Sequence, residues 1–243
     1  MSPQAASPVP PGSQGGGAPC SVSPARCAGS SFTCAERPAA LAPRLLVFAK
    51  APQPGAVKTR LIPALGAQAA ADLARRMLLH TLEQAKAAGV GVVELCMSPA
   101  PGAPAWAGVD LPDGIERSDQ GAGDVGQRMA RAVDRVTTTL GQPVLLMGTD
   151  CPALSAQHIA QAAAALAQHD AVIIPVADGG YVLIGLHAPC PEVFTDMAWS
   201  TDTVASETLQ RMAAQGLKVW TGPLLHDIDE PVDLVHVPSE WHL

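Results

Sequence analysis

Short apolar runs alternate with longer segments of helical periodicity from residue 44 onward, and this alternation constrains the fold more than any other feature. The apolar runs predict buried strands at 45–49, 90–97, 143–148, 170–176, 181–186 and 217–221. Amphipathic stretches with Ser/Thr starts or Gly stops predict helices at 67–89, 125–136, 156–168 and 200–216. The repeated order of strand, helix and strand favours one α/β domain with a doubly wound, mainly parallel sheet.

Residues 1–43 have a different composition, rich in Pro, Gly, Ser and Ala and poor in bulky apolar side chains. Such a segment buries too little apolar surface to offset its chain entropy, so we expect a disordered tail before a domain at 44–243. Three cysteines in this tail, Cys20, Cys27 and Cys34, match no zinc-ligand spacing, and we interpret them as reduced thiols.

The formal net charge of −7, with 15% charged residues, indicates which partners to expect. A general nucleic-acid-binding protein needs a basic face that displaces counterions, so we expect no nucleic-acid partner. No apolar run approaches the roughly 20 residues that cross a bilayer. The N-terminus also lacks a basic segment followed by an apolar one. We therefore expect a cytoplasmic protein with no membrane partner.

A basic loop follows the first predicted strand. Lys50, Lys58 and Arg60 are interleaved with Gly and Pro before the helix at 67–89. In an open parallel sheet, ligands bind at the carboxyl ends of strands, where this loop would lie, and clustered cations there predict a polyphosphate ligand.

The loop differs from known nucleotide-binding turns. Pro52 and Val57 occupy the two glycine positions of GxxxxGK[ST], so the backbone cannot wrap phosphates as a P-loop does. No GxGxxG follows the first strand either, which disfavours a dinucleotide-binding oxidoreductase.

Acidic residues follow the later strands. Asp150 lies in the turn after the strand at 143–148, where it could hold a divalent ion against phosphate oxygens or act as a turn residue. Asp227 and Asp229 alternate along the chain, so in an extended segment they point to one side and could share a cation. Asp229 could instead be the N-cap of a short helix with Pro231 in its first turn.

Six blocks occur in this order: AKAPQPGAVKTRL, QGAGDVGQRM, GTDCPAL, DGGYVLIGL, AWSTDTV and DIDEPVDL. Over residues 44 to about 235 they resemble the bacterial DUF2064 family, whose members are described as glycosyltransferases of GT-A fold. The layout is also similar to the 2-phospholactate and molybdenum-cofactor guanylyltransferases. The resemblance implies a nucleotide-diphospho-sugar transferase-like fold and a metal-dependent glycosyltransferase with a nucleotide-sugar donor, a small-molecule acceptor and Mg²⁺ or Mn²⁺.

Two alternatives stay open at this point. One is a guanylyltransferase-like nucleotidyltransferase that uses a nucleoside triphosphate and releases pyrophosphate. The other is a non-catalytic nucleotide-binding protein, which would not need an acceptor-side carboxylate. The base, sugar, acceptor and oligomeric state are not indicated by the sequence.

The resemblance also implies roles for individual residues. The nucleotide is implied to contact Lys50, Pro52, Gly55, Lys58, Thr59, Arg60, Gln120, Gly123 and Asp124. Asp150 and Asp229 are implied as metal ligands. Asp178 would accept the acceptor's proton while Lys58 and Arg60 stabilise the departing diphosphate. The acceptor side would include Gly179, Gly180, Tyr181, Trp199 and Asp227, although Trp199 could simply fill a loop.

Overall fold

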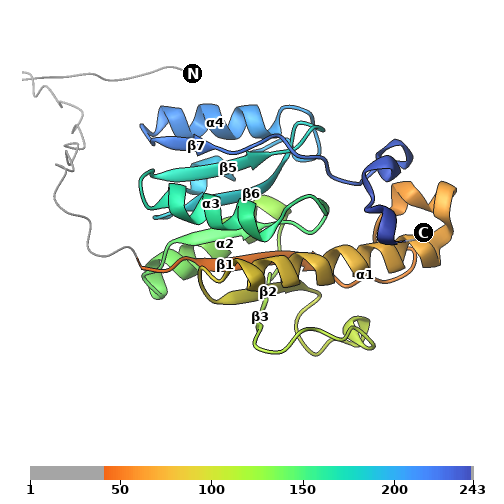
Figure 1. Cartoon of the computed structure of the whole chain (residues 1–243). Helices are drawn as coiled ribbons and strands as arrows, with labels where there is room; N and C mark the ends of the chain where they lie inside the picture. Colours follow the sequence, from red (N-terminus) through yellow and green to blue (C-terminus); the bar gives the residue numbers. More distant parts are fainter. Residues whose placement is uncertain (1–40, 242–243) are drawn as a thin grey trace, which may run out of the picture. The chain divides into compact units, whose positions relative to one another are not determined.

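The computed structural model describes residues 41–241 and contains a seven-stranded sheet with helices on both faces (Figure 1). The strands are β1 (Arg44–Lys50), β2 (Val93–Ser98), β3 (Glu116–Asp119), β4 (Val144–Met147), β5 (Ala171–Pro175), β6 (Tyr181–Leu186) and β7 (Val219–Thr221). Their order is β3-β2-β1-β4-β6-β5-β7, and only β6 runs antiparallel to its neighbours. The predicted doubly wound, mainly parallel sheet is therefore confirmed.

Two helical layers cover the sheet. Helices α1 (Ile62–Ala88) and α3 (Ala156–Leu166) pack on one face, and α2 (Val125–Asp134) and α4 (Val204–Ala214) pack on the other. A π-helical turn, η3 (Arg135–Thr139), continues α2. The short 3₁₀ helices are η1 (Thr59–Leu61), η2 (Pro104–Trp106), η4 (Pro191–Val193), η5 (Pro231–His236) and η6 (Ser239–Trp241). Within residues 41–241, no helix has the length and apolarity to cross a membrane.

The strand β1 shows why the sheet is buried on both faces. Leu45 and Val47 pack against the layer of α1 and α3, whereas Leu46 packs against the layer of α2 and α4. A strand covered on both sides reads as a continuous apolar run, which is how the sequence predicted it. The apolar stripe predicted for α1 is likewise buried and comprises Leu73, Met77, Leu78, Leu82 and Ala85.

Helix ends follow the expected chemistry. Ser155 caps α3 and accepts a hydrogen bond from the backbone N–H of His158, which confirms the predicted N-cap. Gly89 ends α1 in the left-handed conformation, with φ 64°. Asp124 caps α2 in the same way as Ser155, because its Oδ1 accepts the N–H of Gln127 at 2.8 Å.

One strand was missed. The Pro- and Gly-rich stretch after β2 reads as a loop, and so does the segment behind it, yet Glu116–Asp119 pairs with β2 as the edge strand β3. Its sequence, ERSD, contains no apolar residue, because an edge strand need not bury its side chains. The predicted tail at 1–43 lies outside the described residues apart from 41–43, and its three cysteines lie outside them as well.

A buried ion-pair cluster joins four segments, β1, β2, β3 and η3, at the amino ends of β1 and β2. The Glu94 side chain is only 3% exposed, and one of its oxygens accepts a 2.8 Å hydrogen bond from Arg44 Nη1. Arg135 pairs with the other oxygen, and Arg44 also contacts the exposed Glu116 at 2.7 Å. Burial would raise the pKa of Glu94, but the hydrogen bond from Ser118 and the two guanidinium groups outweigh it and lower this pKa.

Candidate functional site

The segments that carry the predicted site residues meet at the carboxyl edge of the parallel strands. The loop after β1 and the turn after β4 reach this edge directly. Because β6 is antiparallel, the β5–β6 hairpin also turns here and brings Asp178 with it. The extended segment 222–230 then crosses the same edge, since its Ile228 N–H donates to the carbonyl of Asp150 at 2.8 Å.

Lys58 contacts the acidic side of this edge. Its Nζ lies 2.6 Å from Asp150 Oδ1, 2.7 Å from Asp229 Oδ1 and 2.6 Å from the carbonyl oxygen of Ile228. An ammonium has three N–H donors, so all of them are used. Burial would lower the pKa of Lys58, but the two carboxylates outweigh it and raise this pKa, so the side chain is a cation.

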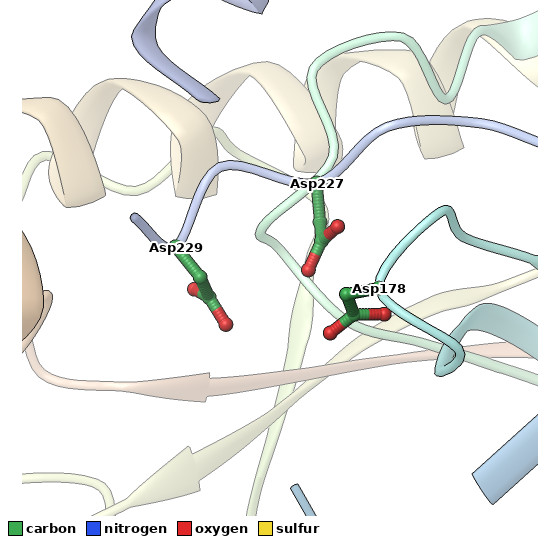
Figure 2. A group of neighbouring side chains, drawn as sticks. All are labelled: Asp178, Asp227 and Asp229. Carbon is green, nitrogen blue, oxygen red and sulfur yellow. The ribbon is translucent and has the colours of Figure 1, made fainter. Parts of the chain in front are cut away.

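Three carboxylates form a cluster, which we call the aspartate trio: Asp178, Asp227 and Asp229. Each offers one oxygen, and these oxygens lie within 4.8 Å of one another. Figure 2 shows the three side chains pointing into the same space, Asp178 from the β5–β6 hairpin and the other two from segment 222–230. The predicted alternation thus places Asp227 and Asp229 on one side.

The pKa of Asp227 is shifted by its burial and by the neighbouring carboxylates. Burial, followed by the neighbouring Asp178 and Asp229 carboxylates, raises the pKa of Asp227 to about 7. A cation bound to the trio would offset the repulsion among the three carboxylates and so lower this pKa. The donor set, made only of carboxylate oxygens, is the kind that Mg²⁺ and Mn²⁺ prefer.

Two contacts fix the conformation of the β5–β6 hairpin that carries Asp178. Asp178 Oδ1 accepts the backbone N–H of Gly180 at 2.7 Å, which fixes the carboxylate against its own turn. Gly179 has φ +89°, and a Cβ there would lie 2.1 Å from the carbonyl oxygen of Asp202. Only glycine fits this position, where the hairpin meets the loop before α4.

A cavity of about 230 Å³ opens beside the basic loop, at the ends of β1 and β2. Its lining includes Lys50, Gln53, Val57, Ser98, Pro99 and Ala105. Gln53 Nε2 donates to the carbonyl of Ala105 at 2.6 Å and so ties the basic loop to η2. The cavity is smaller than the roughly 300–1,000 Å³ of a site for a whole drug-sized ligand, so it suits one part of a ligand, such as a heterocyclic base.

The basic loop connects the cavity with the carboxylates. Val57 lines the cavity, and the next residue, Lys58, contacts Asp150 and Asp229. Two further cations lie in this region: the exposed Lys50, and Arg128, whose Nη1 is 3.4 Å from Ser98 Oγ. Sequence reasoning missed Gln53, Ser98, Pro99 and Ala105, and treated Arg128 only as a secondary candidate that could contact phosphate or pair on a helix face.

The remaining nucleotide-side residues predicted from the sequence lie in and around the basic loop and the turn before α2. Arg60 is exposed and lies 3.4 Å from Glu230, while Pro52 is buried. Gly55 and Thr59 are exposed on the basic loop, and Gly123 is exposed with φ +107° and accepts a hydrogen bond from Arg128 Nε.

Three predicted side chains are held by contacts within the fold. Gln120 is buried, and its Nε2 donates to the carbonyls of Ala49 and Cys96 at 3.1 and 2.8 Å. Tyr181 and Trp199 both pack against the core between the sheet and the layer of α2 and α4. The structure therefore gives these three side chains packing or bracing roles, and gives Asp124 the role of a helix cap.

The helix-cap alternative for Asp229 is wrong by one residue. Glu230 is the N-cap of η5, and its backbone N–H donates to Asp233 at 2.7 Å. This leaves the carboxylate of Asp229 free of a capping role, and it contacts Lys58 and the trio instead.

Similarity to known proteins agrees with this architecture. A crystal structure from Desulfovibrio desulfuricans G20, provisionally named as a nucleotide-diphospho-sugar transferase, is 31% identical, with a TM-score of 0.73 over 80% of this chain and 85% of that one. A cytidylyltransferase from Leptospira borgpetersenii is 14% identical, with a TM-score of 0.55 over 84% and 88%, which shows a shared fold. Rv0371c from Mycobacterium tuberculosis H37Rv, solved in complex with manganese, is 16% identical with a TM-score of 0.46 over 80% and 97%.

The fold and the 31% identical structure place the chain among enzymes of the transferase class, with a nucleotide-diphospho-sugar transferase-like fold. The family model described as "Uncharacterized protein conserved in bacteria (DUF2064)" matches residues 81–201. The chain belongs to the DUF2064 family. No curated protein matches it at a significant level.

Proposed function

We propose that this protein is a metal-dependent glycosyltransferase that uses a nucleotide-sugar donor. The observation that carries the proposal is the aspartate trio on the same sheet edge as a base-sized cavity and a basic loop. The named activity of the Desulfovibrio desulfuricans structure supports it.

The trio is the proposed site for one Mg²⁺ or Mn²⁺ ion. When bound, such an ion supplies positive charge that stabilises the departing diphosphate. Asp150 was predicted as a ligand, but it is not among the three carboxylates whose oxygens lie within 4.8 Å of one another. We therefore assign the ligand role to Asp178, Asp227 and Asp229.

The donor nucleotide is proposed to place its base in the cavity and its phosphates over the basic loop. Lys50 lines the cavity, and Arg128 Nη1 lies 3.4 Å from Ser98, which also lines it. Arg60 is exposed in the same basic loop. These three cations would hold the diphosphate as negative charge develops on it. Lys58, predicted for the same task, has its donors occupied by acidic partners.

Asp178 is proposed to act on the acceptor. Its carboxylate is exposed, and only Oδ1 is held by the Gly180 N–H. As the acceptor oxygen forms its bond to the sugar and the sugar–phosphate bond breaks, Asp178 would take the hydroxyl proton and the nucleoside diphosphate would leave with the bonding electrons. Gly179, Gly180 and Asp227 would border the acceptor.

Nucleotidyl transfer is the second candidate, because the fold is shared with a cytidylyltransferase. The same cations and trio would then favour attack of an acceptor phosphate on the α-phosphorus of a nucleoside triphosphate, with loss of pyrophosphate. A non-catalytic nucleotide-binding protein is disfavoured, since simple binding does not call for three crowded carboxylates at the acceptor side.

A donor panel tests the proposal. With Mn²⁺ or Mg²⁺ present, a nucleotide sugar is expected to raise the melting temperature and release a nucleoside diphosphate on turnover, because ligands that bind the native state stabilise it. Thermal shift and phosphate-product assays measure both effects. Release of pyrophosphate from a triphosphate supports the second candidate instead. If binding and turnover persist in EDTA, the proposed dependence on a divalent ion is excluded.

Filling the cavity is expected to weaken nucleotide binding. Ala105→Leu places a larger side chain against the space assigned to the base and should weaken nucleotide affinity by about tenfold or more, or about 1.4 kcal/mol. Titration calorimetry with a nucleoside diphosphate measures this. Ala107→Leu is the matched control, because Ala107 is exposed and does not line the cavity. Equal affinities for the two variants would show that the base binds elsewhere.

A further inference from the structure

We propose that Lys58 is a positioning residue whose ammonium occupies the place of a second cation, between Asp150 and Asp229, and so fixes the aspartate trio. This inference rests on the proposed function in taking the trio as the site of one divalent ion. It assigns Lys58 to the assembly of that site, whereas the sequence pattern assigned it to phosphate.

The surroundings of the ammonium are those of a bound cation. Two carboxylate oxygens and one carbonyl oxygen approach Nζ at 2.6–2.7 Å, and the Lys58 side chain is 7% exposed. Lys58 adopts the left-handed conformation, with φ 46° and ψ 42°, which non-glycine residues rarely take. Moving the ammonium toward a phosphate would break its contacts with Asp150, Asp229 and the Ile228 carbonyl at the same time.

Lys58 also fastens the segment that carries two members of the trio. Its Nζ binds the carbonyl of Ile228, while the N–H of Ile228 binds the carbonyl of Asp150 at 2.8 Å. The Ile228 side chain is fully buried in a small core with Leu61 and Leu73. Figure 1 shows this blue C-terminal segment beside the orange start of α1. With Ile228 held on both sides of its backbone, the flanking Asp227 and Asp229 are directed toward Asp178.

Removing the ammonium should therefore create a metal site. Lys58→Ala would leave the oxygens of Asp150, Asp229 and the Ile228 carbonyl around an open space, and oxygen donors of this kind bind divalent ions. If Lys58 only stabilised the fold, its removal would not create a site for a divalent ion, and the number of ions bound would not change.

The test counts Mn²⁺ ions per chain by electron paramagnetic resonance and equilibrium dialysis, using the full chain. Lys58→Ala is expected to bind one more Mn²⁺ than the wild type, whereas Lys58→Arg, which keeps the charge, is expected to match the wild type. Equal counts for Lys58→Ala and the wild type would overturn the inference. The wild-type count tests the proposed function separately: a count of zero rejects a metal at the trio, and the difference between variants still decides the role of Lys58.

Folding is monitored by circular dichroism in the same samples. If Lys58→Ala is unfolded without metal, the inference requires Mn²⁺ to restore its native spectrum and to raise its melting temperature more than that of the wild type. No recovery with Mn²⁺ would count against the inference. The double variant Lys58→Ala with Asp150→Asn removes one positive and one negative charge, and its Mn²⁺ count is expected to return to the wild-type value.

Discussion

Asp178→Asn is expected to weaken Mn²⁺ binding by about 10–100-fold and to lower turnover by about 10²–10³-fold, because one charged oxygen leaves the trio and the proposed proton acceptor is lost. The substitution keeps an Oδ1 that can accept the Gly180 N–H, so the hairpin should retain its shape. Titration with Mn²⁺ and an assay of nucleoside diphosphate release measure the two effects.

Asp134→Asn is the matched control for this change. Asp134 is exposed on α2 and is not a member of the trio, yet the substitution alters the net charge by the same amount. Its metal affinity and turnover are expected to equal those of the wild type. Should Asp178→Asn bind Mn²⁺ as tightly as Asp134→Asn does, the trio would not be the metal site.

Glu94→Ala is expected to lower the free energy of unfolding by about 3–5 kcal/mol, because it leaves the buried Arg44 and its neighbour Arg135 without their shared carboxylate. Urea unfolding followed by circular dichroism measures the loss. Since this cluster lies at the amino ends of β1 and β2, away from the edge that carries the trio, Mn²⁺ binding by the folded fraction should be unchanged.

Glu116→Ala removes the other carboxylate that contacts Arg44 and provides the control. Its side chain is 57% exposed, so the loss should be about 0–1 kcal/mol. The loss of stability at acidic pH gives an independent check of the Glu94 pairs. Because the pKa of Glu94 lies below its ordinary value of 4.5, its stabilisation is present at neutral pH and is lost as the pH falls through the folded-state value. Equal losses for the two variants would show that the buried pairs contribute little.

The strands and helices could be predicted because burial leaves a direct trace in the sequence. β1 and β4 are covered on both faces and read as continuous apolar runs, while the stripe of α1 repeats at helical spacing. β3 left no such trace, since ERSD lies at the sheet edge. The strands at 170–176 and 181–186 were both predicted, but the antiparallel direction of the second depends on the tight turn at 176–180, which the apolar pattern does not encode.

Individual residues of the site could be predicted from the sequence, but most of the contacts between them could not. The alternation of Asp227 and Asp229 follows from an extended backbone, and the structure confirms that they share one side. Whether Asp150 or Asp178 joins them depends on how β5 and β6 are paired and on where the Lys58 side chain reaches, which are long-range features. The cavity was missed because its lining comes from three separate segments, and the two that contain Ser98 and Ala105 contribute no charged residue to it.

The reversed direction of β6 has a consequence for how such an enzyme could change its specificity. A parallel neighbour would have to be reached through a long crossover, whereas β5 and β6 are joined by the tight turn at 176–180. The proposed donor side is anchored in long helical connections, whereas the proposed acceptor side borders a short turn that contacts the α4 layer through the close approach of Gly179 to the loop before α4. Grafting this turn together with the loop before α4, with Asp178 kept, is therefore expected to transfer acceptor preference between family members while donor use stays the same.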